Sequence, residues 1–158
     1  MATAVPRANP PSDDAERFVR AFAAMWDRPT VEGFGALMHP DVRLVQPLAR
    51  PARGAREACE WFAGMLALVP GIRIAVYRWS GTPDALFIEW TATATFAGKP
   101  VRWSAVDRFR LADGKVLERI AYFDPLPLLG VVVRRPSGWL GFVRSRLGAR
   151  LRGAAPAG

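Results

Sequence analysis

The first half of the chain carries apolar residues at helical spacing, interrupted by short breaks. Ser12 can cap a helix, acidic residues follow in its first turn, and Pro29 ends the apolar stretch behind them. A second short helix is expected between Pro29 and His39. A third follows Gly54, where apolar residues recur along one side of a helix. These residues are Ala58, Trp61, Phe62, Met65 and Leu66.

From Ile72 the period of the pattern changes from 3.6 to 2, which is typical of strands. Alternation runs over 72–79, 86–95, 101–111 and 116–124, and Asp113-Gly114 is a hairpin signal. A short strand over 43–46 and a loop over 47–53 precede the third helix. The order predicts an α+β fold, with three N-terminal helices packed on the concave side of a curved, cone-shaped antiparallel sheet. The mouth of such a cone is a usual place for a small-molecule site.

The length of 158 residues suits one domain. We expect a flexible leader over 1–12, the cone domain over 13–125 and a C-terminal tail over 126–158. The N-terminal residues lack the apolar stretch of a signal peptide, and the longest apolar run, 126–133, is too short to cross a bilayer. A single cysteine, Cys59, fits a reducing compartment. The expected location is cytoplasmic.

The net charge of +8 is concentrated in the tail. Residues 1–124 hold 16 Lys and Arg against 14 Asp and Glu, whereas the remainder holds six Arg and no acid. Without a stacking platform or finger spacing, this charge predicts no specific nucleic-acid binding. Residues 137–152 read as a basic amphipathic helix, which either contacts an anionic membrane surface or packs on the domain or a dimer interface.

Several short motifs resemble a known family. They are Gln46-Pro47 at the end of the short strand, Gly54 at the start of the third helix, Asp107-Arg108-Phe109, Asp113-Gly114-Lys115-Val116 and Tyr122-Phe123-Asp124-Pro125. Together they resemble the nuclear-transport-factor-2-like superfamily and, within it, the SnoaL-like group of polyketide cyclases, ketosteroid isomerases and limonene epoxide hydrolases. The resemblance implies a homodimer and a hydrophobic small molecule as ligand.

The resemblance also implies positions for catalytic residues. The acidic oxyanion donor of the steroid isomerases matches Asp107, whereas their base position falls on Gln46, which cannot remove a proton from carbon. Of the epoxide hydrolase carboxylates, only the one at the end of the last strand matches, at Asp124. Trp90 and Ala92 occupy the other hydrolase positions.

The strand pattern itself makes Asp107 a candidate, because it shares the apolar face of its strand. Desolvation would favour a neutral carboxylic acid that donates a hydrogen bond to a substrate oxygen, as the ketosteroid isomerases themselves illustrate. The alternative is a structural hydrogen bond or ion pair inside the cone. Asp124 would act as base or water positioner, or would form the turn before Pro125.

The remaining candidates are polar or aromatic residues that could line the pocket. Gln46 and Tyr122 could hold a substrate oxygen, and the aromatic and sulfur-containing side chains either line the pocket or form the core. These side chains are Phe22, Trp61, Phe62, Met65, Trp90 and Trp103. The sequence predicts no metal site and no cofactor, because it lacks a ligand cluster, a phosphate-binding loop and a nucleophile elbow.

Two functional hypotheses remain open from the sequence. The first is a cofactor-free isomerase, cyclase or hydrolase of a polyketide, steroid or terpenoid-like compound, with Asp107 as acid and Asp124 as its partner. The second is a non-catalytic protein that binds a hydrophobic ligand or serves as a membrane-associated scaffold.

Overall fold

The computed structural model describes residues 12–47, 49–96 and 98–126, and the predicted leader and basic tail lie outside this part of the chain. The helices are α1 (Asp13–Asp27), α2 (Val31–Ala36) and α3 (Gly54–Leu68). The strands are β1 (Met38–Gln46), β2 (Ala49–Arg53), β3 (Arg73–Thr82), β4 (Ala85–Phe96), β5 (Lys99–Ala112) and β6 (Lys115–Tyr122).

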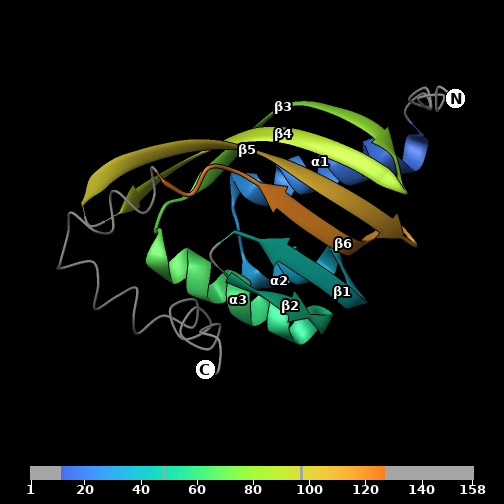
Figure 1. The fold of residues 1–158 in the computed structure, drawn as a ribbon, viewed down its shortest axis with the longest axis horizontal. Helices are drawn as coiled ribbons and strands as arrows, with labels where there is room; N and C mark the ends of the chain where they lie inside the picture. The colour runs from blue at the N-terminus through green and yellow to red at the C-terminus, as the bar shows by residue number, and fades with distance from the viewer. Residues whose placement is uncertain (1–11, 48, 97, 127–158) are drawn as a thin grey trace, which may run out of the picture.

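The strands form one curled, open sheet in the order β2-β1-β6-β5-β4-β3. All neighbouring strands are antiparallel except β1 and β6, which pair in parallel. The sheet bends over the helices, with α1 beneath β3 to β5 and α3 beneath β1 and β2 (Figure 1). The predicted α+β architecture, with three helices against one side of a curved sheet, is therefore confirmed.

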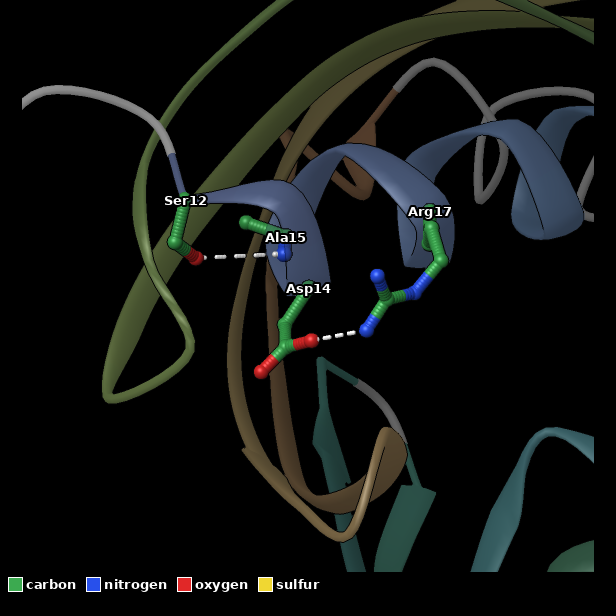
Figure 2. A network of polar contacts seen from close by, with 4 residues as sticks. All are labelled: Ser12, Asp14, Ala15 and Arg17. Carbon is green, nitrogen blue, oxygen red and sulfur yellow. Dashed lines mark hydrogen bonds and ion pairs between the residues drawn. The ribbon is translucent and has the colours of Figure 1, made fainter.

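Helix α1 begins as the sequence predicts. The Ser12 hydroxyl accepts a hydrogen bond from the backbone N–H of Ala15 at 3.3 Å, and Asp14 pairs with Arg17 one turn later (Figure 2). The cap provides an acceptor for a backbone N–H that has no partner within the helix. The acidic residues of the first turn complement the positive end of the helix dipole.

Aromatic rings join the helices to the concave face. Phe109 of β5 meets Phe18 and Phe22 of α1, with ring centroids 5.2 and 5.5 Å apart. Phe62 of α3 stacks on Phe34 of α2, with centroids 4.1 Å apart and planes 8° from parallel. These contacts identify the side of β5 that carries Phe109 as the inner face of the sheet.

Residues 49–53 differ from the sequence prediction, because they form strand β2 rather than loop. The segment is rich in Arg and contains Pro51, a composition that argues against a strand in the middle of a sheet. However, β2 lies at the edge of the sheet and pairs only with β1, so a residue without a backbone N–H is tolerated. Strand β1 also begins earlier than predicted, at Met38.

The predicted hairpin at Asp113-Gly114 is present, with φ values of 52° and 71° at these two residues. Just beyond it, Leu111 pairs with Val116 but Arg110 pairs with Glu118, so Leu117 has no opposite residue and forms a bulge. From this point on, the residues of β6 that face inward are shifted by one position. Arg119 and Ala121 therefore share the inner face with Phe109 and Asp107.

Candidate functional site in the cone interior

The interior between the helices and the concave face is apolar, with one exception. Asp107 on β5 is fully buried, and Arg119 on β6 is only 8% exposed. Nε of Arg119 donates to Oδ2 of Asp107 at 2.8 Å, and Nη2 donates to Oδ1 at 3.1 Å. This two-point contact is the geometry in which a guanidinium binds a carboxylate most strongly.

The pairing decides what Asp107 can do in this structure. Both carboxyl oxygens act as acceptors for Arg119, so the group is not arranged to donate a hydrogen bond to a ligand oxygen. The ion pair inside the cone, left open by the sequence, is the arrangement observed. A catalytic role for Asp107 stays a prediction and would have to include Arg119.

Arg119 was not among the residues singled out in the sequence. A strictly alternating β6 would place Ile120 and Tyr122 inward with Val116, and the bulge at Leu117 reverses this from Glu118 onward. Arg119 could have been predicted from one observation. A carboxylate on an apolar face requires a cation nearby, and Arg119 is a cation on the adjacent strand.

The bulge also decides where the two candidates at the end of β6 lie. Tyr122 pairs with Val106 on the outer face and is 53% exposed. Asp124 is exposed, and its Oδ1 accepts a hydrogen bond from the backbone N–H of Leu126 at 2.9 Å, which is the turn-forming role. The structure therefore brings neither residue to the inner face that carries Asp107.

The other candidates are distributed along the interior and its rim. Gln46 is half-buried at the end of β1, and Trp103 is half-buried on β5. The remaining predicted pocket residues are buried in one continuous apolar cluster; they are Phe22, Trp61, Phe62, Met65 and Trp90.

Three tryptophans in this cluster have unsatisfied polar atoms. The indole N–H groups of Trp26 on α1, Trp61 on α3 and Trp90 on β4 are buried without a hydrogen-bond acceptor among the described residues. Each such group costs about 1–3 kcal/mol, so natural proteins rarely leave them open. Trp26 and Trp61 flank the same ring, Phe62, with centroids 5.5 and 6.5 Å away. Within the described residues, these three indole groups are therefore buried hydrogen-bond donors of the interior that remain unsatisfied.

Within residues 12–47, 49–96 and 98–126, no group of three or more His, Cys, Asp or Glu could hold a metal ion. In the same ranges, no helix has the length and apolar character needed to cross a membrane.

Comparison with proteins of known structure supports the fold. The structure of TerC co-crystallized with polyporic acid superposes with a TM-score of 0.69 at 22% identity, over 77% of this chain and 99% of that one. A putative SnoaL-like polyketide cyclase from Jannaschia sp. CCS1 gives a TM-score of 0.67 at 19% identity, over 84% and 100% of the two chains. An LEH-like epoxide hydrolase from M. tuberculosis gives 0.64 at 21% identity, over 82% and 95%.

A search of functionally curated proteins found no significant match. At the identities seen among solved structures, the likeness establishes the fold and leaves the activity open. The SnoaL-like domain family, in contrast, matches the sequence directly over residues 19–119, which is well over half of the chain. This protein belongs to the SnoaL-like domain family.

Proposed function

We propose that the protein binds an apolar small molecule carrying carbonyl or hydroxyl oxygens, in the interior between α1, α3 and the concave face of the sheet. The observation that carries this proposal is the set of three buried indole N–H groups that have no acceptor in the part of the chain that the structure describes. A guest with oxygen acceptors would satisfy these donors and would lie among apolar side chains.

The charges of the interior favour a neutral ligand. The guanidinium of Arg119 is compensated by the carboxylate of Asp107, so the described interior has no net charge to attract an ion. Polyketide, steroid and terpenoid ketones or alcohols combine this neutrality with a large apolar surface. Among the structural neighbours, TerC was co-crystallized with polyporic acid, and another is described as a putative SnoaL-like polyketide cyclase.

Catalysis without a cofactor is the second candidate, and Arg119 is the residue that favours it. Asp107 engages Nε and Nη2, whereas Nη1 has no partner among the described residues. A cation held in place by a carboxylate can stabilise negative charge that develops on a substrate oxygen, as in an isomerase, a cyclase or a hydrolase. In that reaction Asp107 is a positioning residue.

The binding proposal is tested with two ligands that differ only in oxygen. Fluorenone carries a carbonyl group and fluorene is the matching hydrocarbon, and polyporic acid serves as a third probe. Calorimetry should show that replacing Trp90 by phenylalanine weakens fluorenone binding about 3- to 10-fold, which corresponds to one hydrogen bond, and leaves fluorene binding unchanged.

The matched control is Trp79→Phe, because Trp79 is a half-buried tryptophan whose indole N–H is not among the orphaned donors. It should bind fluorenone like the unmodified protein. Equal losses for both ligands in the Trp90 variant would indicate a packing defect instead. Absence of saturable binding for all three compounds would count against the proposal.

The homodimer, the membrane contact of residues 137–152 and the cytoplasmic location stay predictions.

A further inference from the structure

A hollow of about 240 Å³ lies at the β3 edge of the sheet, away from the paired charges of the interior. Most of its lining belongs to the outer face, where β3, β4 and β5 present polar side chains, and the last residues of α1 complete it. Its lining residues are Trp26, Asp27, Arg73, Ile74, Ala75, Tyr77, Thr91, Thr93 and Arg102.

The two arginines of this hollow lack carboxylate partners among the described residues. Nη1 of Arg73 donates to the backbone oxygen of Ile72 at 2.9 Å, and Nη2 of Arg102 donates to the hydroxyl of Tyr77 at 3.0 Å. Nearby, Arg78 on the same strand as Arg73 is paired with Glu89. Each guanidinium has five N–H donors, so Arg73 and Arg102 keep most of theirs for another acceptor.

The hydroxyl group of Tyr77 indicates the electrostatic character of the hollow. The pKa of Tyr77 lies below its usual value of 10.0, chiefly because Thr91 donates a hydrogen bond to the tyrosine oxygen and also because Arg102 lies beside it. These effects outweigh partial desolvation and the nearby charge of Glu89. The hollow therefore stabilises negative charge on an oxygen atom at this position.

We propose that this hollow is a second binding site, which holds the carboxylate group of a small molecule between Arg73 and Arg102. The two guanidinium groups and the single carboxylate of Asp27 leave one net positive charge, which matches a monoanion. The hydroxyl groups of Thr93 and Tyr77 add neutral donors, and the exposed ring of Tyr77 offers apolar surface to the remainder of the ligand.

The direct test is calorimetric titration of the full-length protein with benzoate and with benzamide, its neutral analogue. Benzoate should bind saturably and at least about tenfold more tightly than benzamide, because a charge-assisted bond is lost in the amide. Arg102→Gln should weaken benzoate binding by about tenfold, whereas Asp27→Asn should strengthen it about two- to threefold by removing repulsion.

Arg110→Gln is the matched control, since Arg110 is an exposed residue on the same face of β5 that does not line the hollow. It should leave benzoate affinity unchanged.

Equal losses of benzoate affinity in the Arg102 and Arg110 variants, or equal affinities for benzoate and benzamide, would overturn the proposal. Tighter binding of inorganic phosphate than of benzoate would overturn the assignment of a carboxylate. Circular dichroism confirms that each variant is folded.

A spectroscopic prediction follows from the two tyrosines of the chain. In a Tyr122→Phe background, Tyr77 is the only tyrosine, and its ionisation can be followed by ultraviolet absorbance. Thr91→Val should raise the pKa of Tyr77, because the largest cause of its lowering is removed. Thr95→Val, on the same face of β4 but outside the hollow, should not change it. An unchanged pKa in the Thr91 variant would mean that the Thr91 hydroxyl is not what lowers the pKa of Tyr77.

Saturating benzoate should also raise the pKa of Tyr77, because a bound anion disfavours the tyrosinate. The shift should be clearly smaller in Arg102→Gln at the same benzoate concentration, because this variant binds benzoate about tenfold more weakly. If benzoate binds without any change in this pKa, the bound anion lies elsewhere on the protein and the proposed site is wrong.

Discussion

Replacing Asp107 by asparagine should lower the free energy of unfolding by about 3–5 kcal/mol. The substitution keeps the shape of the side chain but removes its charge, so Arg119 is left in an apolar interior without a counter-ion. Desolvating an unpaired guanidinium is far more costly than losing a pair on the surface. Urea denaturation at neutral pH measures the change.

Two controls separate the ion pair from a general effect of substitution. Glu89→Gln breaks the exposed pair with Arg78 on the outer face and should change stability by less than about 1 kcal/mol. The double substitution Asp107→Leu with Arg119→Met removes both charges and should recover most of the stability lost in the single variant. A single Asp107 variant as stable as the unmodified protein would argue that the pair is not structural.

Replacing Phe62 by alanine should destabilise the protein by about 3–5 kcal/mol. Phe62 has no exposed surface, stacks on Phe34 and meets Trp26 edge-on, so the truncated side chain leaves a cavity at the junction of the three helices. Thermal and urea denaturation should agree on the loss. A much smaller value would mean that the surrounding rings collapse into the space.

Phe87→Ala is the appropriate comparison, because Phe87 is a phenylalanine on the outer face of β4 with 43% of its surface exposed. Its truncation should cost no more than about 1 kcal/mol. If the Phe62 and Phe87 variants lost similar stability, burial in the cone interior could not be the cause of the Phe62 effect.

The arrangement of helices and sheet was predictable because it depends on strong periodic signals. The apolar side of α3, the capped start of α1 and the Asp113-Gly114 turn each indicate one structure only. The inner position of Asp107 followed from alternation within a single strand, which needs no knowledge of its neighbours. The SnoaL-like resemblance, read from short motifs, was confirmed by the family match.

The structural features that could not be predicted depend on how the strands pair with one another. Strand β2 is stabilised as an edge by β1, against the preference of Pro51 and its neighbouring arginines. The pairing of Asp107 with Arg119 could not be predicted from alternation, because one unpaired residue, Leu117, changes which side chains of β6 face inward. The outer hollow joins three strands and the end of α1, and no local pattern reveals such a combination.

The bulge at Leu117 also affects how this chain should be aligned with its relatives. An alignment anchored on the Asp113-Gly114 turn would equate Ile120 with the inward residue of a relative whose last hairpin is regular. Functional residues would then be transferred to the wrong side of the sheet. Aligning the last strand through its pairing with β5, and placing a one-residue gap at Leu117, compares Arg119 with the residues that share its environment.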